Sequence, residues 1–102
     1  MTNFINLTPH AIVLNDGRTF DATGNVARVQ ADLVDLGNGM FRQTFGDVQG
    51  LPAPVDGTMF IVSGLVFSAT DRTDVVAPAT AHKDVKRNDA GQIVSVPGFI
   101  VK

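Results

Sequence analysis

The chain has 102 residues, the length of one domain, and we treat residues 1–102 as a single domain. Its formal net charge is −2 and no basic block appears, which argues against a dedicated nucleic-acid binder. Because cysteine is absent, disulfides and thiolate metal sites are excluded, and no apolar run reaches membrane-spanning length. The opening residues, MTNFINL, show no signal-peptide pattern, so we expect a soluble protein that stays where it is made.

The acidic residues are all Asp, ten in number, and the chain also has ten Gly and five Pro. These residue types favour turns over helix interiors, so the composition predicts strands joined by tight turns. Residues 3–14 predict two short strands around a corner at Thr8-Pro9-His10, where Pro9 removes a backbone donor. Asn15-Asp16-Gly17 then predicts a type I′ hairpin turn, with residues 18–22 as the returning strand.

Residues 26–48 predict a second hairpin. From Val29 to Leu33 apolar and polar residues alternate, which is the pattern of a half-buried antiparallel strand. The alternation shifts near Leu33-Val34, where we expect a β-bulge that restores the apolar face. Gly37-Asn38-Gly39 predicts the turn into the second strand of this hairpin.

The longest apolar run begins at Met59, and Met59 to Val62 predict a buried strand. Residues 63–71 fit two structures. Ser63 is suited to cap a helix whose one face carries Leu65, Val66 and Ala69, but Leu65, Phe67 and Ala69 also alternate as in a strand. We predict a helix of about two turns, because the apolar run is too long for one strand.

The chain becomes polar after Pro78, and a turn is expected at residues 88–91. Residues 92–101 predict a closing strand in which Pro97 must lie at a sheet edge or a bulge, since proline has no N–H to donate. The closing segment VSVPGFIVK is apolar enough to pair with a second copy of the chain. We therefore expect a homo-oligomer.

Together these elements predict a mainly β fold, in the β-rich α+β class. We expect a compact antiparallel sheet, barrel-like, in a single domain with one short helix near residues 63–71. The predicted core consists of large apolar residues from all of these segments: Leu7, Ile12, Val29, Phe45, Phe60, Val62, Leu65, Phe67, Val75, Ile93 and Phe99.

No catalytic residue, metal site or cofactor is predicted. His82 and Asp84 have strand spacing, but a metal site normally needs three or four ligands, so a solvated hairpin is the better interpretation. Ser63 lacks the glycine two residues before it that a nucleophile elbow requires, which favours its role as a helix cap. No glycine-rich phosphate loop is present.

The residues best suited to hold a small anionic or polar ligand are Thr8, His10, Arg72 and Asp74. Pro9 interrupts the strand, so the backbone groups of Thr8 and His10 are expected to face outward as donors and acceptors. Arg72 offers a fork of donors that fits a carboxylate or phosphate, with Asp74 orienting it. The alternative is a structural turn at Pro9 and a structural ion pair of Arg72 with Asp71 or Asp74.

Several segments, NLTPHAIVL, GNVARV, GDVQGLPAPVDGTMFIVSGLV, RTDVVAPA and GQIVSVPGF, occur in this fixed order and cover nearly the whole chain. In this order they resemble a family of small tailed-phage and prophage proteins that open with an Asn-Leu-Thr-Pro-His segment. The resemblance implies a phage origin and expression in the cytoplasm of a bacterial host, with the virion as a second location. It implies no catalytic residues.

Three functions from different classes follow. The first is a small non-enzymatic binding protein that engages a host protein or a small ligand during infection, since the chain has no catalytic constellation. The second is a minor virion or assembly protein. The third is an enzyme or sequestering protein that acts on a nucleotide-like anion through Arg72 and His10. A membrane or nucleic-acid partner is not expected.

Overall fold

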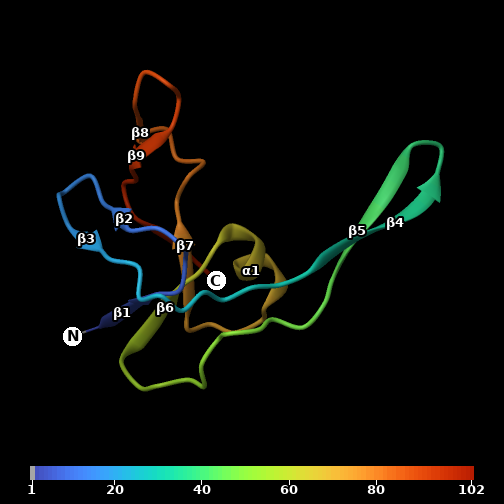
Figure 1. The fold of residues 1–102 in the computed structure, drawn as a ribbon, viewed down its shortest axis with the longest axis horizontal. Helices are drawn as coiled ribbons and strands as arrows, with labels where there is room; N and C mark the ends of the chain where they lie inside the picture. Colours follow the sequence, from blue (N-terminus) through green and yellow to red (C-terminus); the bar gives the residue numbers. More distant parts are fainter. Residues whose placement is uncertain (1) are drawn as a thin grey trace.

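The computed structural model describes residues 2–102, which form ten short strands and one helix (Figure 1). In chain order the elements are β1 (Asn3–Asn6), β2 (Ile12–Val13), β3 (Thr19–Phe20), β4 (Ala31–Gly37), β5 (Met40–Phe45), β6 (Thr58–Ile61), α1 (Gly64–Ala69), β7 (Val75–Pro78), β8 (Lys86–Arg87), β9 (Ile93–Ser95) and β10 (Phe99–Val101). The predicted β-rich single domain with one short helix is therefore confirmed. Among the described residues no helix is long and apolar enough to cross a membrane.

The central sheet has the strand order β1-β6-β7-β10. Its inner pairs, β1 with β6 and β6 with β7, are parallel, and only β7 with β10 is antiparallel. The expected antiparallel pairing thus holds for β7–β10 and for the three separate hairpins, but it is wrong for the middle of the sheet. For β6 and β7 the reason is α1, which follows β6 and returns the chain to the starting end of the sheet, so that β7 runs in the same direction as β6. β1 and β6 are joined by the long segment of residues 7–57, which likewise returns the chain before β6 begins.

Both faces of this sheet are covered. On one face the helix residue Val66 packs with Phe60, Val62 and Val75 in the main hydrophobic cluster. Strand alternation turns Ile61 to the opposite face, where it is also fully buried. Residues 60–62 therefore read as a continuous apolar run, because every residue of this run meets other protein atoms whichever way it points.

The predicted core is partly right. Leu7, Phe60, Val62 and Val75 are buried, and Ile12, Val29, Phe67 and Phe99 are half-buried. Phe45, Leu65 and Ile93 were expected in the core but are 38%, 41% and 41% exposed. The buried apolar residues absent from the prediction are Leu14, Ala27, Ile61, Val66, Val76, Ala77 and Val96. Some of these residues, such as Ile61, lie on the second covered face of the sheet. Alternation of apolar and polar residues predicts only one buried face, so it does not identify them.

A barrel is not confirmed, although the sheet curls. Phe4 on β1 and Phe99 on β10, the two edge strands, stack with ring centroids 5.6 Å apart. Phe20 of β3 packs edge-on against both rings, at 5.4 and 5.5 Å. Side chains thus bridge the two edges of the sheet, but β1 and β10 are not hydrogen-bonded neighbours, so the backbone ladder stays open.

The short helix follows the sequence closely. Ser63 is its N-cap, with the hydroxyl oxygen accepting the Val66 N–H at 3.3 Å, as its position before the apolar run predicts.

The first hairpin turn differs from the type I′ prediction. Gly17 has φ +95°, but neither Asn15 nor Asp16 has a positive φ. The Leu14 N–H donates to the Arg18 carbonyl just beyond β2 and β3, so the loop has three residues, 15–17, of which only the glycine is left-handed.

The single closing strand predicted over residues 92–101 is wrong, because the chain forms two strands there that belong to different sheets. Pro97 lies in the break between β9 and β10, at neither a sheet edge nor a bulge, and its missing N–H is consistent with the interruption. Homo-oligomer formation through this segment stays a prediction.

Candidate interaction surface

Thr8 and His10 belong to a turn that closes on the buried side chain of Asn6. The Asn6 Oδ1 accepts the backbone N–H of Thr8 at 2.9 Å and its hydroxyl at 2.7 Å. The Asn6 Nδ2 donates to the carbonyl oxygens of His10 at 2.8 Å and Phe20 at 2.9 Å. The expectation that the backbone of Thr8 and His10 faces outward is therefore wrong for these groups, which the fold uses itself, and only the His10 side chain is exposed.

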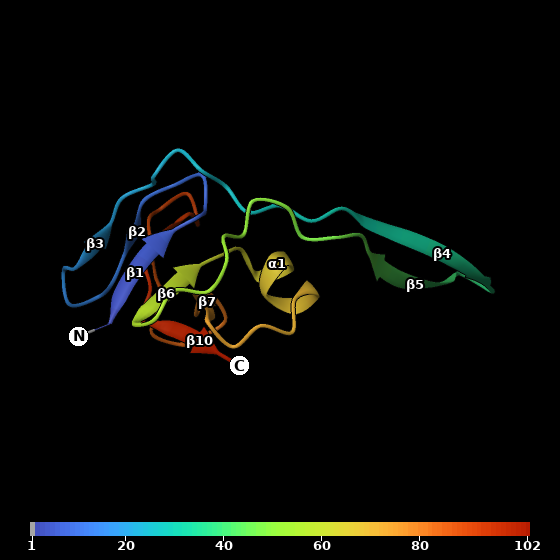
Figure 2. The same ribbon diagram turned by 90° about the horizontal axis from the view of Figure 1, so that it is seen from below.

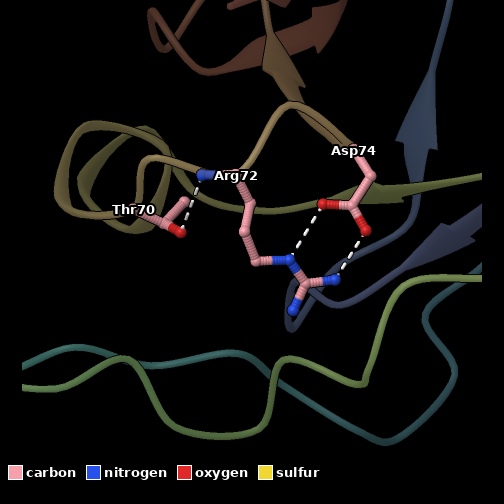
Figure 3. A network of polar contacts seen from close by, with 3 residues as sticks. All are labelled: Thr70, Arg72 and Asp74. Atoms are coloured by element: carbon pink, nitrogen blue, oxygen red, sulfur yellow. Dashed lines mark hydrogen bonds and ion pairs between the residues drawn. The ribbon is translucent and has the colours of Figure 1, made fainter.

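Arg72 and Asp74 form a two-pronged ion pair in the loop between α1 and β7 (Figure 3). The Nε of Arg72 lies 2.9 Å from Oδ1 of Asp74, and Nη2 lies 2.5 Å from Oδ2. The guanidinium carbon also lies 5.9 Å from the centre of the buried Phe60 ring. Hydrogen bonding to Arg72 lowers the pKa of Asp74, and the same bond raises the pKa of Arg72. This is the structural pairing that the sequence offered as the alternative to a ligand site.

The four predicted ligand residues form two separate pairs. Asn6 lies opposite Ile61 and Phe60 lies opposite Val75, so Thr8 follows the carboxyl end of β1 whereas Asp74 precedes the amino end of β7. This register separates Thr8 from Asp74 by about four residues along the strands, or ~13 Å. The structure joins Thr8 to His10 and Arg72 to Asp74, but it does not gather all four, and their ligand role stays a prediction.

His82 and Asp84 lie together in the polar segment after β7. The Asp84 N–H donates to Nδ1 of His82 at 3.0 Å, and the Asp84 carboxylate is 3.8 Å from the same atom. Within residues 2–102 no group of three or more His, Asp, Glu or Cys side chains is placed to hold a metal ion.

The most distinctive feature is the hairpin of β4 and β5, which projects away from the body of the domain (Figure 2). We call residues 30–46 the arm. The Cα radius of gyration is 15.2 Å, whereas about 13 Å is expected for a globular chain of this length. The projection of the arm accounts for a molecule that measures 47 × 38 × 23 Å.

The arm is firmly held at both ends. Its tip turns through Asn38 and Gly39, whose φ values of 57° and 77° are those of a type I′ turn. At its base Arg28 and Gln49 exchange two backbone hydrogen bonds of 2.8 Å, and Gly46 N–H donates to the Gln30 carbonyl at 2.8 Å. The predicted hairpin over residues 26–48 is thus present, with its register shift between residues 35 and 37 and not at 33–34.

The surface of the arm is apolar and uncovered. The predicted half-buried face holds for Val29 and Ala31 at the base and fails from Leu33 onward, because every residue of β4 and β5 other than Ala31 is exposed. Six large apolar side chains are exposed: Leu33 at 66%, Val34 at 46%, Leu36 at 49%, Met40 at 56%, Phe41 at 57% and Phe45 at 38%. Together they expose on the order of 600 Å² of apolar surface, distributed over the two faces of the arm.

Both faces of the arm contribute to this surface. Pairing of Leu33 with Gln43 and of Asp35 with Phe41 places Leu33 and Phe41 on one face, together with Phe45. Val34, opposite Arg42, lies on the other face. The central sheet is also apolar on two faces, but both of its faces are covered by the domain, whereas the apolar residues of the arm are exposed on both faces.

Adjacent apolar residues in each strand are the sequence feature that indicates this two-faced surface. Leu33 and Val34 are adjacent apolar residues, as are Met40 and Phe41, so neither strand keeps one apolar face. The bulge predicted at the first pair is wrong, because Leu33 and Val34 pair in regular register with Gln43 and Arg42. Consecutive apolar residues in a strand require cover on two sides, and here the domain supplies none.

Comparison with protein-family models, with curated proteins and with solved structures finds no match to this chain.

Proposed function

We propose that this protein is a small non-enzymatic binding protein whose arm engages a protein partner. The observation that carries the proposal is the projecting hairpin with exposed apolar residues on both faces. A two-stranded hairpin is at best marginally stable in water by itself, so an apolar arm of this kind gains most from a partner that covers it.

The setting of this interaction comes from the resemblance of the ordered segments to phage and prophage proteins. On that basis we propose that the protein is phage-encoded and acts in the cytoplasm of a bacterial host during infection. The Asn-Leu-Thr-Pro-His segment then serves the fold, since Asn6 ties together the turn that carries Thr8 and His10.

Site-specific photo-cross-linking tests the arm. A photoreactive phenylalanine analogue replaces Phe41 on the arm or, as a matched control, Val55 in the loop before β6, because their exposed fractions are 57% and 56%. In bacteria that carry the gene, during phage induction, we expect protein cross-links at position 41 well above those at position 55. Equal cross-linking at both positions, or none at position 41, contradicts the proposal.

A second candidate is a minor virion or assembly protein. It is favoured by one observation, the presence of two free strand edges on the arm, which allows copies or partners to be added on both sides. Mass spectrometry of washed, purified particles tests this function, which requires the chain to be present in several copies per particle. Its absence from the particles rejects the virion role and leaves the binding role standing.

A further inference from the structure

The arm has two unpaired strand edges. β4 and β5 pair only with each other among the described residues, so each has a row of backbone N–H and C=O groups without a neighbouring strand. The strands span seven and six residues, long for exposed edges, which proteins usually keep short, twisted or covered. Such edges are templates for pairing with another strand.

The charges of the two edges are opposite. β4 carries Asp32 and Asp35, whereas β5 carries Arg42. In the described part of the chain none of these three is in an ion pair, although Arg18, Arg72 and His82 each are. Asp35 accepts the Gly37 N–H at 2.8 Å near the tip, whereas Asp32 accepts only a longer bond of 3.4 Å from the Gln30 side-chain amide. Asp32 and Arg42 are therefore the charges best placed for an external contact.

These charges select one partner arrangement. If two copies met by their β4 strands, acidic residues would lie beside acidic residues, and a meeting of β5 strands would place arginine beside arginine. Like charges in neighbouring positions across strands are destabilising. The β4 edge of one copy is complementary to the β5 edge of another, and Asp32 and Arg42 lie on the same face of the hairpin, so they can meet.

We propose that copies of this chain associate through their arms, the β4 edge of one copy pairing with the β5 edge of the next. This inference rests on the proposed function and names the partner of the arm as a second copy. The pairing is head-to-tail, so each copy keeps one free edge for a further copy, and assembly continues to a closed ring or a longer row.

The apolar area of the arm is shared between its two edges. A stable interface takes about 800 Å² from each partner, so the apolar surface on the order of 600 Å² is divided between two contacts, each of which also draws on backbone hydrogen bonds and polar atoms. When paired arms close into a ring, one face of the shared sheet turns inward. The face with Leu33, Phe41 and Phe45 carries both phenylalanines of the arm and is the better candidate for the inside.

Charge reversal with the purified full-length protein tests the pairing. Sedimentation velocity of the native chain should show an assembly of three or more copies that grows with protein concentration. Asp32→Lys and Arg42→Asp should each lower the association constant at least tenfold, because each variant presents edges of less favourable charge. An equimolar mixture of the two variants should regain the assembly, since each supplies the charge that the other lacks.

The controls make the same charge changes outside the arm. Asp56→Lys and Lys83→Asp alter exposed residues in other loops and should leave the assembly unchanged. Circular dichroism checks that each variant is folded. As a measurement that needs no variant, amide hydrogen exchange of the native chain should show concentration-dependent protection in both β4 and β5.

Each contrary result has a definite meaning. A strict monomer at all concentrations, a strict dimer, or protection confined to one arm strand overturns head-to-tail pairing. If the purified chain is monomeric but position 41 still cross-links to a different protein in cells, this inference fails and the proposed function stands. If position 41 also gives no cross-link above the control, both fail.

Discussion

Phe60→Ala probes the core most directly. The Phe60 side chain is 1% exposed, packs with Val62 and Val75, and lies under the Arg72 guanidinium. Replacing a buried phenylalanine by alanine costs about 3–5 kcal/mol, through lost burial and the cavity that remains. A domain of this size is stable by only about 5–15 kcal/mol, so the loss is a large part of the total.

Urea denaturation followed by circular dichroism measures this loss. With a slope of about 1–3 kcal/mol per molar urea, the midpoint for Phe60→Ala should fall by at least ~1 M. Phe41→Ala is the matched control at a protein concentration low enough to keep the chain monomeric, because it removes the same side chain from the arm, where Phe41 is 57% exposed in the single chain. We expect this control to cost about 1 kcal/mol or less.

Two outcomes of the comparison between Phe60→Ala and Phe41→Ala would contradict these expectations. If Phe41→Ala destabilises the chain as much as Phe60→Ala at the same protein concentration, the arm is not the uncovered element described above. If neither variant changes the midpoint, the central cluster does not hold the fold together.

Two further predictions concern the ion pair and the base of the arm. Because the folded-state pKa of Asp74 is lowered, its pair stabilises the fold above pH ~4 and this contribution is lost as the pH falls toward the folded value. Asp74→Asn should therefore flatten the acid side of the stability–pH curve more than Asp16→Asn, whose pair is more exposed; equal curves refute this. Gly50→Ala should destabilise the chain by more than the ~1–2 kcal/mol of left-handed strain, because its Cβ would lie 2.6 Å from a backbone oxygen. Gly24→Ala, with φ +88° and no atom within 4 Å, should show the strain alone in the same denaturation assay, and equal costs would contradict the close contact.

Local signals predicted local structure well. Ser63 before the apolar run predicts the helix cap, and Asn38-Gly39 predicts the tip of the arm, because a cap or a two-residue turn depends on only a few neighbouring residues. Local patterns could not predict the parallel pairing of β1 with β6, since the two strands are separated in the sequence by the whole arm. Local patterns predict that a strand forms, but they do not fix which strand lies beside it.

The candidate site was harder to predict for a related physical reason. Arg72 and Asp74 have the spacing of a pair, so the sequence presented ion pairing as the alternative, and the geometry adopts it. Leu65 and Ile93 have the apolar character of core residues, yet they are exposed. Hydrophobicity predicts that a residue prefers burial, but the partner that buries it depends on how the elements assemble, within the chain or between chains.

The hydrogen bonds that fix the base and tip of the arm affect how much conformational entropy it loses on binding a partner. A hairpin that ordered only on binding would lose conformational freedom at that moment, which weakens association. Here the two Arg28–Gln49 hydrogen bonds and the Gly46–Gln30 bond fix the base, and the left-handed Asn38 and Gly39 fix the tip. The two strands between them are therefore set in register before any partner arrives. An arm that is ordered in advance, apolar on two faces and free at two edges can bind with little further loss of entropy, and this favours a built-in interaction element over an accidental protrusion.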